Sequence, residues 1–327
     1  MSVSLAVSLA LLAVKFLAYR ITGSAAVLSD ALESIINVVA SGFGLYSVAL
    51  AGKPPDKSHP YGHGRIEFFS AGFEGALIVL AAVAILYKAL PQLLSPPSLR
   101  ELNLGVGLVG GAAAVNCALG SFLVRSGRRS GSLALVADGR HILTDVWTSA
   151  GVVGALLLVR STGWMILDPI VACSVAGHVL ISGAVLVRAS VGRLMDEADV
   201  EALARIVRAL SAQRKPEWIE LHHLRSWRSG RRHHTDFHLT LPRYWDLSQC
   251  HRTEKELERA VLDEIGDDGE VIVHFDPCTA VYCRSCKVEE CPVRSEKGQD
   301  GIPWTLGSAT GGPRHEYSPP SGDTAAA

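Results

Sequence analysis

Residues 66–94 read IEFFSAGFEGALIVLAAVAILYKALPQLL, and this stretch decides the class of fold. Within it only Glu67, Glu74 and Lys88 carry a charge. A helix of this length exceeds the roughly 20 residues that cross the ~30 Å hydrocarbon core of a bilayer. The stretch therefore predicts a membrane-spanning helix.

Five further apolar runs of about the same length lie near residues 3–21, 26–51, 103–125, 133–159 and 164–188. The first contains Lys15 and has no basic segment before it, so it indicates a spanning helix rather than a signal peptide. The loops 52–65 and 125–132, and the segment after the sixth run, carry more Lys and Arg than the alternate loops. The positive-inside rule then places both termini in the cytoplasm of a multi-pass protein of the cell (inner or plasma) membrane.

Charge is divided unevenly along the chain. Of the first 190 residues 22 are charged, against 41 of the last 137. This division excludes a single soluble globule, a disordered chain and a coiled coil. The formal net charge of −1 provides no strongly basic region, so we expect no nucleic-acid partner.

The charged part predicts a small α+β domain with helices on one face of a sheet. Its elements follow the order αββαβ, with helices at 198–213 and 247–265 and strands at 218–228, 233–241 and 270–275. We expect three regions: a six-helix transmembrane domain (1–192), a cytoplasmic domain (193–280) and a cysteine-containing, then Gly/Pro-rich tail (281–327). The composition of the tail after about residue 295 predicts disorder.

Ionisable residues inside two of the apolar runs indicate a site for a divalent metal ion. Glu33 and Asn37 are four residues apart in the second run, and His141 and Asp145 are four apart in the fifth. An i, i+4 pair lies on one helix face, so two facing pairs supply four ligands for a tetrahedral cation. The alternative is that these groups only join helices; in a membrane an ion path is the commoner reason for such residues. Asp30 and Asp168 fit either an ion path or packing.

Two further groups of metal-ligating residues lie outside the apolar runs. The loop GKPPDKSHPYGHGR contains Asp56, His59 and His63, which either bind one metal or form a polar turn. The cysteines Cys278, Cys283, Cys286 and Cys291 have the spacing C-x4-C-x2-C-x4-C. On the cytoplasmic side metal binding or free thiols are favoured over disulfides, so these cysteines are a possible extra metal site.

The stretches TGSAAVLSDALES (22–34), PDKSHPYGHGRIE (55–67), ADGRHILTDVWTS (137–149) and HFDPC (274–278) resemble the cation diffusion facilitators, a family of divalent-metal/proton antiporters. The resemblance covers roughly residues 3–278. It implies six transmembrane helices and a ferredoxin-like, metallochaperone-like cytoplasmic domain that forms a homodimer. It also implies a homodimeric transporter that works by alternating access, with protons as the counter-substrate.

The resemblance implies a role for each matching residue. The transport site falls on Glu33, Asn37, His141 and Asp145, and the loop site on Asp56, His59 and His63. The ligands of the cytoplasmic domain fall on His222, His238, His251, His274 and Asp276. A charge interlock near the dimer interface falls on Arg65 and Asp196.

One departure from the family pattern concerns the metal. Zinc transporters of the family commonly have His or Asp, then Asp, where this chain has Glu33 and Asn37. The site is therefore richer in hard oxygen, which favours Fe²⁺, Mn²⁺ or Co²⁺ and leaves Zn²⁺ possible. These divalent ions are expected as substrate and as structural or regulatory ligands, without an organic cofactor.

Two other functions compete with a transporter. An intramembrane metalloenzyme requires a general base at an open metal position, but the sequence has neither HExxH nor Gly-x-Ser-x-Gly. We therefore assign no catalytic residue and expect no enzyme. The alternative is a non-transporting metal sensor, or a heteromer partner of the same fold. Asn37 is a weak ligand, so the site could bind a metal ion without passing through a transport cycle.

Overall fold

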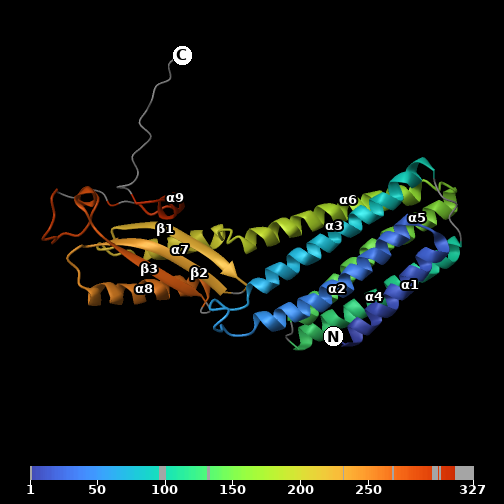
Figure 1. Cartoon of the computed structure of the whole chain (residues 1–327), viewed down its shortest axis with the longest axis horizontal. Coiled ribbons are helices and arrows are strands. Elements are labelled where there is room, and N and C mark those ends of the chain that lie inside the picture. The colour runs from blue at the N-terminus through green and yellow to red at the C-terminus, as the bar shows by residue number, and fades with distance from the viewer. Residues whose placement is uncertain are drawn as a thin grey trace, which may run out of the picture. The chain divides into compact units, whose positions relative to one another are not determined.

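A computed structural model describes residues 2–95, 101–130, 133–230, 232–266, 269–296, 301 and 303–313 (Figure 1). The chain divides into two compact units. The first comprises Met1–Leu50 and Ile66–Val191, and the second comprises Ala51–Arg65 and Gly192–Ala327. The loop after the second long helix therefore packs with the charged, C-terminal part of the chain.

Six long helices form the first unit in the described part of the chain (Figure 1). They are α1 (Ser2–Thr22), α2 (Ala25–Ala51), α3 (Arg65–Leu94), α4 (Leu102–Ser130), α5 (Leu133–Thr162) and α6 (Leu167–Leu194). Four helical segments are long and apolar enough, over described residues, to cross a membrane: Ala25–Ala51, Arg65–Leu94, Leu102–Ser126 and Leu167–Leu194. Parts of α1 and α5 lie outside the residues whose side chains are described. The predicted six-helix membrane fold is confirmed, with four of its helices showing the strongest apolar character.

Glycines end two of these helices. Gly23 and Gly163 have φ of 68° and 72°, a left-handed conformation that glycine adopts without steric cost. Each donates its N–H to the carbonyl four residues earlier, Tyr19 or Val159, at 2.8 Å. This geometry closes the C-terminus of α1 and of α5 and allows the next helix to start within a few residues.

Asp168 has a structural task at the start of α2. Its Oδ2 accepts the N–H of Ala25 at 2.8 Å, and its Oδ1 accepts the Ser24 hydroxyl. The N–H groups of a first helical turn have no partner within the helix, so a buried carboxylate stabilises them. Of the two roles that the sequence allowed for Asp168, the structure therefore favours packing.

Small residues line the interior of the first unit. Its core has alanines from several helices, among them Ala18, Ala26, Ala89 and Ala176, all fully buried. Helices α3 and α6 lie close together at Gly183, where a Cβ atom would lie 3.0 Å from the carbonyl oxygen of Gly75. Small residues permit such approach where lipid gives no hydrophobic drive for helix association. Many large apolar side chains are exposed on the surface of this unit instead, among them Leu80 and Phe122.

The second unit contains the predicted αββαβ arrangement. Its elements are α7 (Val200–Ala212), β1 (Glu220–Ser229), β2 (Arg232–Leu241), α8 (Leu247–Ile265) and β3 (Glu270–Pro277). The strand order is β1-β2-β3, with β1 antiparallel and β3 parallel to β2. Both helices bury apolar side chains against one face of the sheet. Ile206 and Leu210 of α7 and Leu257 and Val261 of α8 belong to the same core cluster as Phe237 of β2. The other face is free to present polar side chains.

The tail differs from the expected disorder over residues 303–313. There α9 (Leu306–Thr310) and the preceding Trp304 pack against the core of the second unit. The Arg214 guanidinium lies 4.3 Å from the centre of the Trp304 ring, and the His223 N–H donates to Gly311 at 2.8 Å. The composition predicted disorder because Gly, Pro and Ser dominate the tail, and an average over the segment gives little weight to single apolar residues such as Trp304.

Candidate metal sites

In the first unit, α2 and α5 meet at two of the predicted transport ligands. The Asn37 Nδ2 donates to Asp145 Oδ2 at 2.6 Å, and both residues are half-buried. Glu33 is also half-buried and lies one turn before Asn37 on α2. His141 belongs to α5, but its side chain lies outside the described residues. Three carboxylate or amide groups thus gather at this part of the helix pair.

A buried ion pair lies next to these residues. Lys15 of α1 and Asp30 of α2 are each 2% exposed, and Lys15 Nζ lies 3.0 Å from Asp30 Oδ1. Lys15 also donates to the Ser34 hydroxyl at 2.9 Å, and the Ser149 hydroxyl of α5 donates to Asp30 at 2.5 Å. Sequence reasoning noted Lys15 and Asp30 separately but missed the pair, because they lie on different helices. The sequence could have suggested the pair, because a charged residue inside a membrane usually has a partner of opposite charge.

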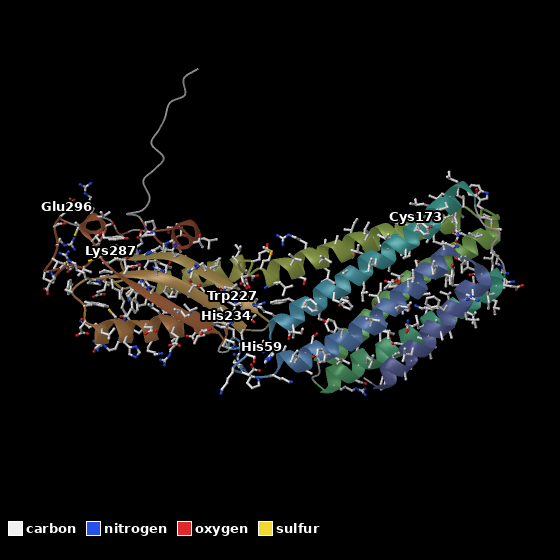
Figure 2. The ribbon with its side chains drawn as sticks, in the orientation of Figure 1. His59, Cys173, Trp227, His234, Lys287 and Glu296 are labelled. Atoms are coloured by element: carbon white, nitrogen blue, oxygen red, sulfur yellow. The ribbon has the colours of Figure 1, made fainter. Side chains whose placement is uncertain are left out.

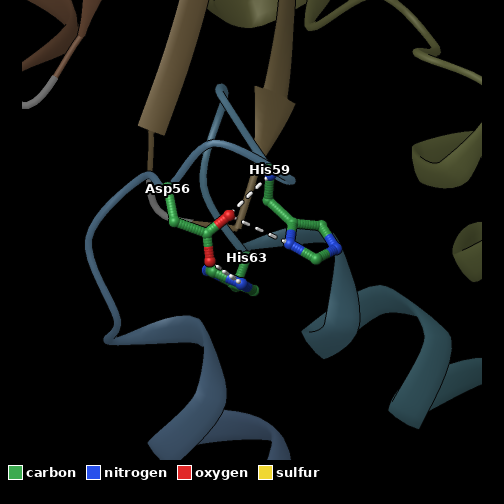
Figure 3. A group of neighbouring side chains, drawn as sticks. All are labelled: Asp56, His59 and His63. Atoms are coloured by element: carbon green, nitrogen blue, oxygen red, sulfur yellow. Dashed lines mark hydrogen bonds and ion pairs between the residues drawn. The ribbon is translucent and has the colours of Figure 1, made fainter.

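In the second unit, Asp56, His59 and His63 lie together in the loop before α3 (Figure 3). Their ligand atoms are all within 4.8 Å of one another. Asp56 Oδ1 is 3.4 Å from His59 Nδ1, and Asp56 Oδ2 is 3.4 Å from His63 Nε2. Two imidazoles and a carboxylate are the ligand types of a zinc-like site, with a further position open to solvent.

The local backbone explains how these three residues converge. Asp56 Oδ1 accepts the N–H of His59 at 2.7 Å and of Ser58 at 2.8 Å, and Gly62 turns the chain with φ of 84°. The N–H of His59 and then that of Ser58 hold the pKa of the Asp56 carboxyl below its usual value. The carboxylate therefore stays ionised, which is its metal-binding form.

Aromatic contacts fasten this loop to the β1–β2 hairpin. Trp227 and His234 are labelled in Figure 2, and their rings stack with centroids 4.3 Å apart. The rings of Tyr61 and His234 form an edge-to-face pair with centroids 5.8 Å apart. Arg65 lies over Trp227 at 4.8 Å, and its Nη2 is 2.6 Å from Asp196 Oδ1. The two residues of the predicted interlock are thus in contact within this unit.

A row of histidines crosses the sheet on the face away from α7 and α8. His222, His238 and His274 are register partners on β1, β2 and β3. Asp276 Oδ2 lies 3.1 Å from His222 Nε2 and 3.0 Å from His238 Nδ1, and Asp276 Oδ1 lies 3.4 Å from His274 Nε2. Side chains alternate across a strand, so register partners project from the same face. We name these four residues the histidine row.

Burial keeps His222 in the form that binds metal. Its side chain is almost inaccessible, and this desolvation lowers the pKa of His222 despite the nearby carboxylates of Glu220 and Asp276. A neutral imidazole has a lone pair to offer a metal ion. The donor set of His222, His238 and Asp276 therefore fits a divalent cation, with ligand atoms within 4.8 Å of one another.

Two other histidines depart from the expected arrangement. His223, which sequence reasoning missed, has φ of 51° at a break in the β1–β2 register, and its ring lies 5.2 Å from that of His238. Strand alternation would have sent it to the opposite face, and no sequence signal marks the irregularity. His251 lies on α8, with Nδ1 3.1 Å from Glu254, and does not belong to the described His222–His238–Asp276 group.

Comparison with known proteins agrees with these observations. Residues 1–195 match the cation efflux transmembrane domain, and residues 198–278 match the cytoplasmic domain of cation efflux proteins. The uncharacterized transporter sll1263 of Synechocystis sp. is 37% identical over 274 residues, which cover 84% of this chain and 88% of that protein. The cation-efflux pump FieF of Shewanella oneidensis is 30% identical over 84% of this chain and 92% of its own length. The chain therefore belongs to the cation diffusion facilitator family, as a membrane-embedded cation efflux transporter and not an enzyme.

Proposed function

We propose that this transporter exports a divalent metal ion from the cytoplasm across the cell membrane in exchange for protons. It acts as a homodimer by alternating access, with both termini in the cytoplasm. The observation that supports the site best is the 2.6 Å contact between Asn37 of α2 and Asp145 of α5. Glu33 and His141 complete the set, each one turn from one of these two residues.

The Asn37–Asp145 hydrogen bond suggests how the site is unloaded. The amide nitrogen of Asn37 donates to Asp145, whereas an amide binds a metal only through its oxygen. For Asn37 to act as a ligand, its amide oxygen rather than its nitrogen must face the ion. Carboxylates and imidazole must also be free of protons to bind metal, so loading releases protons and protonation favours release. Protons and metal thus compete for Glu33, His141 and Asp145.

The ligand chemistry limits the substrate. Two carboxylates neutralise one divalent cation, and three oxygen ligands beside one nitrogen favour Fe²⁺, Mn²⁺ or Co²⁺ relative to an all-histidine site. Zn²⁺ remains among the candidates because its intrinsic affinity is higher than that of Mn²⁺ or Fe²⁺. Asn37 is then the residue that sets selectivity.

The second unit is proposed to bind metal for regulation rather than for transport. The loop group Asp56, His59 and His63 and the histidine row each offer at least three ligands that fit a divalent cation. His251 stays a proposed metal ligand of the cytoplasmic domain, as the family resemblance implies. Metal bound there would favour one arrangement of the two protomers and thereby shift the population of transporting states.

The test is metal uptake into vesicles that contain the purified full chain. Uptake of Zn²⁺, Fe²⁺, Mn²⁺, Co²⁺ and Cd²⁺ is measured with and without a pH gradient, for wild type, Asp145→Ala and Asn37→Asp. We expect wild-type flux to collapse with the gradient, Asp145→Ala to be inactive, and Asn37→Asp to raise the rate for Zn²⁺ relative to Mn²⁺.

Two outcomes would contradict the proposal. Normal flux in Asp145→Ala, in protein that still forms dimers, would remove Asp145 from the transport site. Metal binding by the wild type without any flux would instead support the sensor or heteromer function. Asp168→Asn is a suitable control for structural damage, because Asp168 stabilises the start of α2 without belonging to the proposed site.

A further inference from the structure

The four cysteines that follow β3 converge on one cavity. Cys278 comes directly after the last residue of β3, and Cys283 lies in the 3₁₀ helix η1 (Ala280–Arg284). Together with Cys286 and Cys291 they line a cavity of about 60 Å³, and all four thiols are free. The four cysteines therefore share one cavity, although the set spans 14 residues of chain.

This segment is folded and attached to the sheet. Tyr282 and Cys286 belong to a small apolar cluster with Ile219, and the Tyr282 hydroxyl donates to Glu220 at 2.8 Å. Among the described residues this cluster has four buried members, Ile219, Tyr282, Cys286 and Val288, with Cys278 and Cys291 packed against it. So few apolar side chains provide little stability, and small folded segments of this kind usually depend on a disulfide or a metal.

The guanidinium of Arg294 hydrogen-bonds to several backbone carbonyls around the cavity. Arg294 donates to the carbonyl oxygens of Cys283 at 3.2 Å and Cys286 at 3.4 Å, and also to that of Val288. These bonds hold the two turns that carry Cys283 and Cys286 in a fixed relation. The arrangement restricts the backbone of both turns before any ligand binds, which reduces the entropic cost of binding.

Hydrogen-bond donors also face Cys283. The hydroxyl and the N–H of Ser295 and the N–H of Glu296 all approach its sulfur. Four thiols around one cavity offer a soft divalent ion the sulfur ligands that it prefers.

We propose that Cys278, Cys283, Cys286 and Cys291 bind one Zn²⁺ ion in a structural site that fastens the tail to the sheet. Four sulfur ligands and no open position are typical of a closed, structural zinc site. Cys283 and Cys286 form the close Cys-x2-Cys pair of such sites, and Cys278 and Cys291 complete the set from either side. The cavity suits a single ion better than a cluster of several metal and sulfide atoms. The inference goes beyond the transport function and does not depend on it.

The experiment compares the metal content of the purified full chain, kept reduced, for wild type and Cys283→Ser/Cys286→Ser. We expect the variant to contain one zinc less per chain. Cys117→Ser/Cys173→Ser is the matched control, because those cysteines lie in the first unit, and it should retain the full zinc content.

Substitution with Co²⁺ distinguishes this site from those formed by His and Asp. Four thiolates give an intense sulfur-to-cobalt charge-transfer band, which nitrogen and oxygen ligands do not. We expect this band in the wild type and in the control, its loss in Cys283→Ser/Cys286→Ser, and a weakened, shifted band in Cys291→His. The histidine variant keeps four ligands, so it tests the site even if the serine variant misfolds. The proposal would be overturned by unchanged zinc content in the serine variant or by absence of the band in the wild type. It would also be overturned if the cysteines formed disulfides under a cytosolic glutathione ratio, or if the purified protein had an iron–sulfur chromophore.

Discussion

Asn37 and Asp145 approach each other from two separate helices, whereas His222, His238 and His274 are register partners on three hydrogen-bonded strands. The distance between the first two residues depends on how α2 and α5 pack. The spacing of the histidine row is fixed by the sheet ladder, within the roughly 5 Å that separates neighbouring strands. The ligands in the first unit can therefore change their separation when the helices move. The ligands in the second unit are held at a constant separation by the hydrogen-bonded sheet.

This difference matches the two tasks that we propose. A transport site must release its ion, so its ligands have to separate or change partners during each cycle. A regulatory site must report the metal concentration at equilibrium, which requires a constant geometry and an affinity near that concentration. The contrast leads to four predictions, which run from the largest expected effect to the smallest.

The largest effect is expected when one carboxylate is removed from each site. Asp145→Ala should reduce flux to background, because a ligand that must bind and release the ion is absent. Asp276→Ala should lower flux by roughly fivefold or more at low metal and less at saturating metal, since it removes only a coupling free energy. Vesicle uptake as a function of metal concentration measures both. Complete loss of flux in Asp276→Ala at saturating metal would break the distinction between the sites.

A smaller effect is expected from the buried ion pair beside the transport site. Lys15→Met leaves Asp30 buried without its cation, which should lower the free energy of unfolding by about 3–5 kcal/mol. Lys15→Met combined with Asp30→Leu removes both charges and should recover much of that loss. Thermal unfolding in detergent measures the stability, and vesicle uptake of the double variant measures the function. A stable but inactive double variant would indicate that the pair takes part in transport; equal stability of wild type and Lys15→Met would contradict its structural role.

How far the sequence predicts this molecule depends on how local each feature is. The six helices were predictable because continuous apolar runs encode burial in lipid, and the αββαβ order was predictable from short periodic segments. The packing of Trp304 and the inclusion of Ala51–Arg65 in the second unit were not, because both depend on contacts between distant parts of the chain.

The candidate sites follow the same division. Asp56, His59 and His63 lie within eight residues, and local hydrogen bonds bring them together, so spacing alone suggested them. The histidine row joins three strands, and only the family resemblance indicated it in the sequence. The contact of Lys15 with Asp30 and the approach of His223 to His238 escaped prediction, because one joins two helices and the other depends on a strand irregularity. Metal binding at each of these sites stays a prediction.

The third prediction concerns the loss of stability of the second unit at low pH, independent of any bound metal. His233 of β2 is 2% exposed and accepts the Arg228 Nε–H at 2.9 Å. Burial, then the Arg228 charge, lowers the pKa of His233 below 6.5. Below pH 6.5 the unfolded chain therefore binds a proton that the folded chain does not, so stability falls as pH falls from 6.5 toward the folded pKa.

Unfolding of the metal-free chain between pH 7.5 and 5 tests this effect. His233→Gln removes the titrating group and should flatten the pH dependence relative to wild type. His251→Gln, which replaces an exposed histidine of α8, is the control for the substitution itself. An unchanged slope in His233→Gln would assign the acid sensitivity of the second unit to other groups, including those of the histidine row.

The smallest effect on stability is expected at the exposed pair of Arg65 and Asp196. Their side chains are 45% and 41% exposed, and solvent-exposed ion pairs contribute about 0–1 kcal/mol. Asp196 has φ of 58°, a conformation that asparagine tolerates well, so Asp196→Asn removes the charge without straining the backbone. We expect its free energy of unfolding to change by less than about 1 kcal/mol, as for Glu201→Gln, which breaks the surface pair with Arg205. If the pair is an interlock, Asp196→Asn should nevertheless reduce flux or weaken the dimer, while Glu201→Gln should do neither. Normal flux and dimerisation in Asp196→Asn would make Arg65 and Asp196 an ordinary surface contact.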